Sequence, residues 1–479
     1  MKSILYKIMI IGLILSVFSS CTKDFAKINK DPNRPNEPDA KLLLSNAIRA
    51  IGNQGNGIAG WAKDIYPQYI SEIIYTNESQ FQNRYYNFYP YYEGPLLDLE
   101  LVIKLNTDSI SIKKSKEYGL NVNQIAVSRI LKVFYFMHMT DRWGMIPYSE
   151  SLKGKLNLKA KYDNQKDIYD SFFKELKEAS EQIVVADKLH GDFLLEDMAQ
   201  WKRWANTLRM IAAIHISQVD PAKAKSEFAA GLAAGAITNN EQNVYFKYLP
   251  DAINQNPLYN NYFATNRVDY AISEKLLNTL VKLSDPRLQV YAKPTVKTGE
   301  YKGMPFGVDR EGNPNNKETV SLIGDKFTAQ NYALPLTTFA QVEFMKAEAA
   351  FRGWIPGSAE EFYKSGIEAS MNQHGKTTPA AYLEHPDVKY QAAKGLELII
   401  NQKWIANYQA NGYESWVDWR RTGFPTLHPG PNPQSVHKGI PYRQAYPTSE
   451  EGLNPESYKA AIEAQGANDL NVKVWWDKD

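Results

Sequence analysis

The sequence predicts a mainly α-helical protein whose helices stack in pairs, and three observations support this fold class. Apolar residues recur at helical spacing through most of the 479 residues, and only residues 237–248 have a pattern closer to an extended strand. Small residues such as Ala347, Ala349 and Gly353 occupy places where two helices can approach closely. The single cysteine excludes a disulfide within the chain, so a large packed core must stabilise the fold.

The expected helices follow one another with long excursions between some of them. They span residues 40–51, 61–76, 95–105, 122–143, 167–186, 198–219, 221–234, 273–283, 338–352, 358–372, 390–410 and 454–465. Asp220 is a suitable N-cap for its helix, and Pro221 fits the first turn. Pro67 should interrupt or kink the second helix. Residues 293–327 and 423–450 have no clear periodicity, and irregular segments of this length are usually functional or disordered.

The stretch from residue 395 to residue 425 is predicted to form a packed junction. Its first half has one apolar helical face, made of Leu396, Ile399, Ile400, Trp404 and Tyr408. We expect Gly412 to end this helix in the left-handed conformation. In the shorter helix that follows, Trp416 lies four residues before Arg420, and Asp418 lies three before Arg421. This spacing predicts a guanidinium on an indole face and an ion pair, both structural in role.

The first 39 residues are predicted to lie outside the fold. Lys2 and Lys7 precede an apolar stretch, residues 8–17, that is too short to span a membrane. Two serines then precede Cys21, which is typical of a bacterial lipoprotein signal, although Phe18 departs from the usual leucine. An ordinary signal peptide with a free thiol is the alternative. The predicted organisation is a signal peptide over 1–20, a lipidated N-terminus and polar tether over 21–39, and one folded domain over 40–479.

The charge balance excludes a nucleic-acid-binding class. Residues 1–20 contain two lysines and no acidic residue, so their removal leaves 53 basic and 53 acidic residues. A protein that binds nucleic acid needs a basic surface, which a neutral chain does not predict. No later stretch resembles a transmembrane helix, so the lipid on Cys21 would be the membrane anchor.

Aromatic residues gather near the N-terminal end of the predicted domain. Eleven lie between Trp61 and Tyr92, nearly three times the density of the whole chain. Flat rings beside amide groups suit recognition of a sugar or a short peptide. The predicted ligand contacts are Trp61, Tyr75, Tyr85 and Tyr86, with Asn77, Gln80 and Asn83 as polar contacts, and then Tyr301, Phe306 and Tyr332 from or beside the long irregular segment. The alternative is that these tyrosines pack loops together through bonded hydroxyls.

The sequence predicts no catalytic residue, metal or cofactor. None of the seven histidines has a short metal-ligand spacing, and His138 and His215 lie in apolar helices as expected core residues. Glu414 and Asp418 are neutralised by neighbouring arginines, so they do not stand out as a glycosidase pair.

Several motifs, in order along the chain, resemble the SusD/RagB family of outer-membrane lipoproteins. They are DRWGMIPYSE (141–150), NRVDYAISEKLLNTLVKLSDPR (266–287), EFMKAEAAFRGW (343–354), QKW with GYESWVDWRRTGFP (402–425), IPYRQAYPTSEEGLNPESY (440–458) and VWWDK (474–478). The resemblance implies a tetratricopeptide-like scaffold of helix pairs with long loop excursions. It also implies a cell-surface lipoprotein that captures a glycan or a peptide and delivers it to a SusC-type TonB-dependent outer-membrane transporter.

Two other functions stay open at this point. One is a helical glycoside hydrolase, which would release reducing ends from a bound glycan. The other is a helical-repeat scaffold that binds only protein, which no soluble oligosaccharide or peptide would stabilise against melting.

Changing Cys21→Ala tests the predicted anchor. Because the thiol is the expected attachment point for lipid, the variant should be folded but should no longer fractionate with the outer membrane when its transporter is absent. Membrane fractionation with immunodetection makes the measurement. A variant that stays membrane-bound under these conditions would refute the lipoprotein assignment.

Overall fold

The computed structural model describes residues 39–53, 58–195, 197–311, 313–431 and 439–478. The predicted signal peptide, Cys21 and nearly all of the predicted tether therefore lie outside the described residues. Within the described ranges, no helix combines the length and the apolar character needed to cross a membrane.

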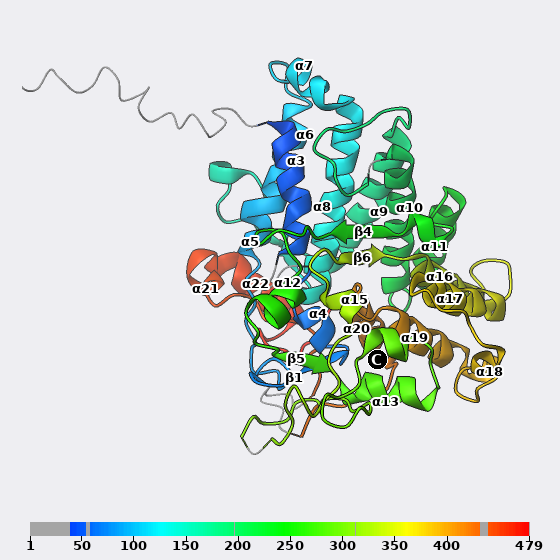
Figure 1. Ribbon diagram of the computed structural model, residues 1–479. Helices are drawn as coiled ribbons and strands as arrows, with labels where there is room; N and C mark the ends of the chain where they lie inside the picture. Colours follow the sequence, from blue (N-terminus) through cyan, green and yellow to red (C-terminus); the bar gives the residue numbers. More distant parts are fainter. Residues whose placement is uncertain (1–38, 54–57, 196, 312, 432–438, 479) are drawn as a thin grey trace, which may run out of the picture.

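The protein is mainly helical, as the sequence predicts (Figure 1). Its α-helices are α3 (Ala40–Arg49), α4 (Ala62–Ile65), α5 (Tyr89–Tyr91), α6 (Leu97–Leu105), α7 (Ile112–Ser115), α8 (Asn121–Trp143), α9 (Gln165–Gln182), α10 (Met198–His215), α11 (Pro221–Ala233), α12 (Pro257–Tyr259), α13 (Glu274–Lys282), α14 (Leu288–Tyr291), α15 (Asp325–Thr328), α16 (Phe339–Phe351), α17 (Ala359–Gln373), α18 (Ala380–Leu383), α19 (Gly395–Ala406), α20 (Gly412–Thr422), α21 (Glu450–Leu453) and α22 (Pro455–Gln465).

Among the residues that the structure describes, six short strands form three two-stranded antiparallel sheets. The strands are β1 (Ile70–Glu72), β2 (Ile146–Pro147), β3 (Tyr162–Asp163), β4 (Val244–Lys247), β5 (Tyr270–Ile272) and β6 (Ala333–Thr337). They pair as β1 with β5, β2 with β3, and β4 with β6. The predicted extended stretch over 237–248 thus contains a strand, β4.

Consecutive helices pack against each other in pairs. The pairs are α8 with α9, α10 with α11, and α16 with α17, and α9 packs on α10 to join the first two pairs. Figure 1 shows these long helices on one side of the molecule, with the short helices and irregular segments beside and below them. The prediction of stacked helix pairs is confirmed.

Side-chain caps explain why several helices begin where the sequence predicts. The carboxylate of Asp220 accepts a bond from the Lys223 amide (3.1 Å), with Pro221 at the first position of α11. The hydroxyl of Thr338 accepts from the Gln341 amide (3.1 Å) at the start of α16. Each cap satisfies an amide that has no partner within its own helix.

The predicted helix over residues 61–76 is wrong. Only α4 forms there, and β1 follows after a turn in which Gln68 is left-handed, with φ of 58°. Pro67 cannot donate the helical hydrogen bond at its position. Ile70 then pairs with Ile272 of β5, so long-range strand pairing replaces the helix that local periodicity predicted.

Gly412 does not end α19 as expected. The helix stops at Ala406, and Gln409, with φ of 53°, is the left-handed residue of the connection. Gly412 begins α20 instead, where a Cβ atom would lie 2.0 Å from the Lys63 carbonyl oxygen. Glycine is needed here for the close approach of two backbones rather than for a left-handed turn. The predicted end of α20 is confirmed by Gly423, with φ of 75°.

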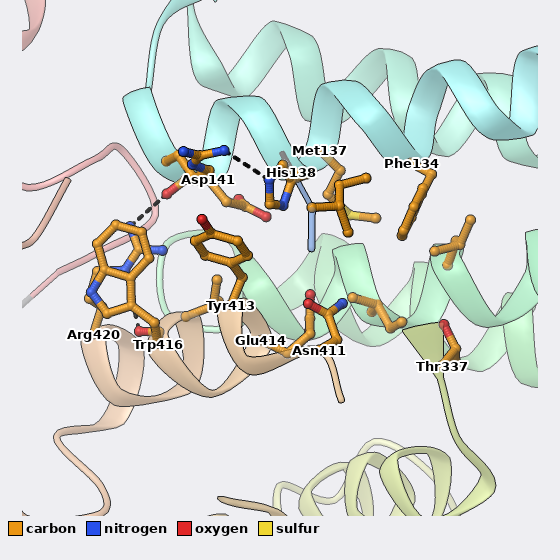
Figure 2. A pocket seen from close by; sticks show the side chains of 15 residues that line it. Phe134, Met137, His138, Asp141, Thr337, Asn411, Tyr413, Glu414, Trp416 and Arg420 are labelled. Carbon is orange, nitrogen blue, oxygen red and sulfur yellow. Dashed lines mark hydrogen bonds between the residues drawn. The ribbon is translucent and has the colours of Figure 1, made fainter. Parts of the chain in front are cut away.

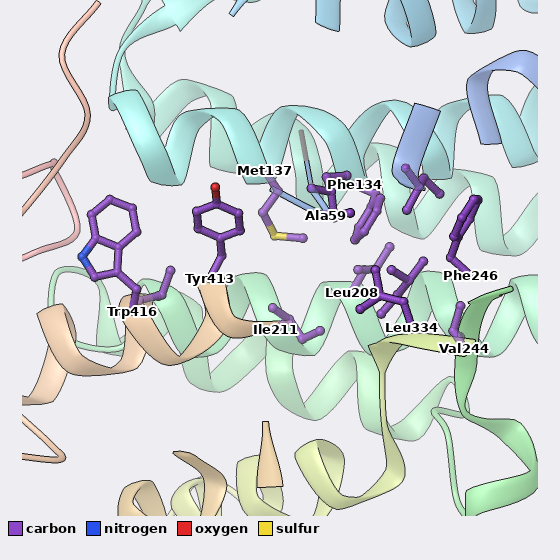
Figure 3. Packing of buried hydrophobic residues seen from close by; sticks show 14 of the residues in the cluster. Ala59, Phe134, Met137, Leu208, Ile211, Val244, Phe246, Leu334, Tyr413 and Trp416 are labelled. Atoms are coloured by element: carbon purple, nitrogen blue, oxygen red, sulfur yellow. The ribbon is translucent and has the colours of Figure 1, made fainter. Parts of the chain in front are cut away.

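A buried apolar cluster joins the helix pairs to the rest of the molecule (Figure 3). Its labelled members come from α8, α10, α20 and the β4–β6 sheet, with one residue from the segment before α4: Ala59, Phe134, Met137, Leu208, Ile211, Val244, Phe246, Leu334, Tyr413 and Trp416. Burying each large apolar side chain stabilises the fold by roughly 1.5–3 kcal/mol. The shared cluster indicates that helix pairs and loops form one folded unit.

The predicted contacts of the junction helix α20 are present. The Arg420 guanidinium carbon lies 3.6 Å from the centre of the Trp416 ring, and Asp418 accepts from Arg421 at 2.8 Å. The Trp416 indole is 1% exposed and donates to the Pro441 carbonyl oxygen (2.8 Å). These residues therefore have a structural role.

Changing Trp416→Ala should cost about 3–5 kcal/mol of unfolding free energy, because a fully buried ring is replaced by a cavity. Urea unfolding followed by circular dichroism measures the loss. The folded fraction should keep its ligand affinity, since the ring is remote from solvent. A stable Trp416→Ala variant that fails to bind ligand would show that Trp416 acts in ligand binding and not in stabilising the fold.

Candidate ligand-binding surface

The segment after β1 presents part of the predicted site to solvent. Tyr75 is 54% exposed and Tyr85 is 47% exposed, and the side chains of Asn77 and Asn83 are also exposed. Between them the chain turns at Phe81, which is left-handed (φ 55°) and buries its ring. The buried phenylalanine fixes the turn, and the polar and tyrosine residues on either side face outward as a consequence.

Tyr75 lies beside two arginines from other parts of the chain. The guanidinium carbon of Arg267 is 5.1 Å from the ring centre, and that of Arg310 is 5.9 Å away. Arg267 is held by an ion pair with Asp269 (2.7 Å). The result is an exposed ring next to guanidinium donors, which can stack on a flat ligand and donate hydrogen bonds to its oxygens. We call Tyr75, Arg267 and Arg310 the tyrosine–arginine patch.

Three predicted contacts are buried and bonded within the protein. Gln80 donates to the Val308 carbonyl oxygen (3.1 Å) and to Asp309 (2.7 Å). The Tyr86 hydroxyl donates to Glu78 (2.8 Å), and the Tyr332 hydroxyl donates to the Gln409 carbonyl oxygen (2.7 Å). For the two tyrosines this matches the alternative of loop packing through bonded hydroxyls, and all three side chains are buried rather than presented at the surface.

Trp61, Tyr301 and Phe306 are partly buried. Trp61 stacks on Tyr270 with ring centres 4.4 Å apart, and it lines a cavity of about 20 Å³ together with Tyr332. That volume holds about one water molecule, so it is no glycan site. Phe306 instead contacts Phe81 (5.9 Å between centres) and also faces a much larger groove.

A groove of about 810 Å³ lies between α13 and α19. Its other walls are residues 305–308 and the chain from Pro425 to Pro431. The hydroxyl of Ser71 donates to the Pro305 carbonyl oxygen (2.8 Å), and Gln68 donates to the His428 carbonyl oxygen (2.5 Å), so both walls are tied to the segment around β1. A volume of this size accommodates a small-molecule ligand.

The sequence prediction did not include the helical walls of this groove. On α13 the polar residues Lys275, Asn278, Thr279 and Lys282 face it, opposite the buried Leu276 and Leu280. Their i, i+3, i+4, i+7 spacing is a second helical face and could have been noticed. The amides of Asn401 and Gln402 on α19 lie within the junction whose apolar periodicity dominated the prediction.

A second enclosed space lies between α8, α10 and α20, but it is structural (Figure 2). Its volume is about 20 Å³, and its wall includes His138, which shares a hydrogen bond with Arg142 (3.0 Å). Burial, then the Arg142 charge, holds the pKa of His138 well below its ordinary value. His138 is thus a satisfied core residue, as predicted.

His215 is the other predicted core histidine, and it lies between two carboxylates. Its ring nitrogens are 3.3 Å from Asp141 and 3.1 Å from Glu414, and the Tyr169 hydroxyl is 2.9 Å away. Burial alone would lower its pKa, but Glu414 and Asp141 together raise the pKa of His215 to about 9. Glu414 is therefore engaged in a structural pair rather than facing a ligand.

A buried carboxyl group lies at the end of β1, three residues before Tyr75. Burial raises the pKa of Glu72 to about 7, although the bonds donated by Ser79 act in the opposite direction. Glu72 accepts from the Ser79 amide (2.9 Å) and hydroxyl (3.1 Å), so it stabilises the turn that carries Tyr75. Among the described residues, no three His, Cys, Asp or Glu side chains are grouped to hold a metal ion.

Comparison with known proteins identifies the fold. A family model described as "Starch-binding associating with outer membrane" matches residues 32–447. The chain belongs to the SusD-like family. Solved structures agree: a chitin-binding protein is 28% identical, with a TM-score of 0.80 over 92% of this chain and 100% of its own. A SusD homologue from Bacteroides fragilis is 24% identical, with a TM-score of 0.78 over 92% of this chain and 100% of its own.

A third similar structure is a chitin-binding SusD homologue from Flavobacterium johnsoniae. It is 24% identical, with a TM-score of 0.74 over 92% of this chain and 98% of its own. No curated protein sequence matches the chain significantly. The matches confirm the tetratricopeptide-like helical scaffold and the family that the motifs indicated. This SusD-like chain is an outer-membrane nutrient-binding protein and not an enzyme.

The His215 cluster predicts how stability depends on pH. A folded pKa near 9 lies above the ordinary value of 6.5, so the stabilisation is complete below about pH 6.5 and is lost as pH rises through 9. Urea unfolding should show a loss on the order of 3 kcal/mol between those limits. His215→Gln should flatten this slope, whereas the exposed His190→Gln should keep it. An unchanged slope in His215→Gln would contradict this assignment.

Proposed function

We propose that this SusD-like protein captures a glycan at the tyrosine–arginine patch and the adjoining groove, and delivers it to a SusC-type TonB-dependent transporter. The observation that carries the ligand site is Tyr75, an exposed ring beside two guanidinium groups on the turn that follows β1. Anchoring of the protein through a lipid on Cys21 is part of the same proposal.

A glycan is favoured over a peptide by the groups that surround the patch and the groove. The exposed amides of Asn77 and Asn83, and those of Asn278 and Asn401 in the groove, each offer both donors and acceptors for sugar hydroxyls. The chitin-binding protein that is 28% identical supports this ligand class, since it shares the fold over nearly its whole length. Peptide capture is the second candidate, which the family resemblance also implies.

Tyr75 and Tyr85 are the predicted ligand-stacking rings, and Tyr75→Ala and Tyr85→Ala test them. Each change should cost under roughly 0.5 kcal/mol of stability because the ring is exposed. Each should weaken binding by about 1–3 kcal/mol, the scale of an interface hot spot. Calorimetric titration with chito-oligosaccharides and malto-oligosaccharides measures the affinity, and thermal melting measures stability.

Conservative variants distinguish a loss of ring stacking on the ligand from a loss of protein stability. Tyr75→Phe keeps the ring and should keep most of the affinity. Tyr86→Phe removes a buried hydroxyl that bonds to Glu78, so it should lower stability and leave affinity unchanged. Large losses of stability with intact affinity in Tyr75→Ala and Tyr85→Ala would show that these tyrosines support the fold and do not bind ligand.

Delivery to the transporter is tested separately, by co-purification with a co-expressed SusC-type transporter. Failure to co-purify would refute the delivery part of the proposal.

A further inference from the structure

The groove between α13 and α19 contains a lysine whose charge is not matched by an acid. Lys275 is half-buried on the groove wall, one turn from Asn278 and Thr279. Among the described residues no carboxylate lies within ion-pair distance of its ammonium group, although many other lysines of the chain have such a partner. A half-buried ammonium keeps part of its hydration, and an anionic group of a ligand can supply the counter-charge that the protein does not.

Other charged residues also line the groove, and one of them differs from Lys275 in its pairing. Lys282 lies on the same face of α13, but Asp387 pairs with it at 2.6 Å. The remaining carboxylates of the groove wall are Glu274, which is exposed at the first position of α13, and Glu397, which lies on the opposite wall. Burial, and then the Lys282 charge, lowers the pKa of Lys275. The groove as a whole therefore carries charges of both signs.

A second polar group on the opposite wall also lacks a partner. The side-chain oxygen of Asn401 is buried and accepts no hydrogen bond from any described residue. It lies on α19, across the groove from α13, and the partly buried Phe306 offers an apolar face at one end. An acceptor, a cation and an apolar ring around 810 Å³ suit a sugar that has hydroxyl donors and an anionic substituent.

We propose that this groove binds an acidic residue of the glycan, a sugar bearing a carboxylate or a sulfate, and that Lys275 is its counter-charge. This inference rests on the proposed glycan-binding function and narrows its substrate class. Asn278 and Asn401 would contact hydroxyl groups of the same sugar. Ser71 and Gln68 tie two walls of the groove to the segment around β1, which leads directly to Tyr75 of the tyrosine–arginine patch.

The test measures the affinity of the full chain for four tetrasaccharides by calorimetric titration. Chitotetraose and cellotetraose are neutral, tetragalacturonate carries carboxylates, and a chondroitin sulfate tetrasaccharide carries both carboxylates and sulfates. At least one acidic tetrasaccharide should bind, and Lys275→Gln should weaken its binding about ten- to a hundredfold, as expected for a charge-assisted hydrogen bond. The same variant should change any neutral binding less than twofold.

Two further variants test whether the effect on affinity depends on the charge at position 275 itself. Lys275→Arg retains the charge and should recover most of the affinity. Lys225→Gln removes an exposed lysine on α11, outside the groove, and should leave every affinity unchanged. Equal loss in Lys225→Gln and Lys275→Gln would show that net charge alone matters, and would overturn the proposal.

The outcomes also separate this inference from the function on which it rests. Neutral tetrasaccharides that bind through Tyr75, with no response to Lys275→Gln for any ligand, would overturn the acidic subsite and leave glycan capture standing. If an acidic peptide bound at Lys275 and no tetrasaccharide bound, both proposals would fail. Binding of an acidic tetrasaccharide that is lost in Lys275→Gln and weakened in Tyr75→Ala would support both.

Discussion

A chain of buried charges holds the helices of this protein in register. Lys403 of α19 pairs with Asp418 of α20 at 2.8 Å, and Asp418 pairs with Arg421 at 2.8 Å. Arg421 in turn donates two hydrogen bonds, of 2.6 and 2.8 Å, to the carboxylate of Glu348 on α16. Burial would raise the pKa of Glu348, but the arginines, Arg421 foremost, hold that pKa at about 2. Removing any one of these four side chains would leave a buried charge without its partner, which is strongly destabilising. The stability of α16, α19 and α20 is therefore coupled.

Helical periodicity and capping chemistry predicted most of this scaffold, because both act over a few residues. Prediction from local sequence patterns was wrong where a segment contacts residues that are distant in the sequence. Residues 61–76 have a helical pattern, yet Ile70 pairs with Ile272, two hundred residues away. Gly412 was expected to turn left-handed, yet it is needed because the Lys63 carbonyl passes too close for a side chain. Neither contact can be inferred from neighbouring residues, since the fold itself creates it.

The candidate site was predicted only in part for the same reason. The aromatic-rich stretch does expose Tyr75 and Tyr85, but tyrosine is equally suited to a core and to a surface. Tyr75 and Tyr86 belong to one aromatic-rich stretch, yet one lies beside arginines at the surface and the other bonds to Glu78 in the interior. The arginines come from distant loops, and the groove requires α13 and α19 to be placed together. Exposure is thus a property of the assembled fold.

The family to which the chain belongs is non-catalytic, and several interior carboxylates of this chain act in structure. The interior carboxylates that might act as an acid and a base are committed to structure: Glu348 to Arg421, Glu414 to His215, and Glu72 to Ser79. A glycosidase needs two carboxylates facing one cleft with separated pKa values. The proposed ligand surface combines a ring face, amides and cations with the groove carboxylates Glu274, Glu397 and Asp387, of which Asp387 pairs with Lys282. The pairing that joins the helices therefore keeps Glu348, Glu414 and Glu72 out of the lining of the proposed ligand groove.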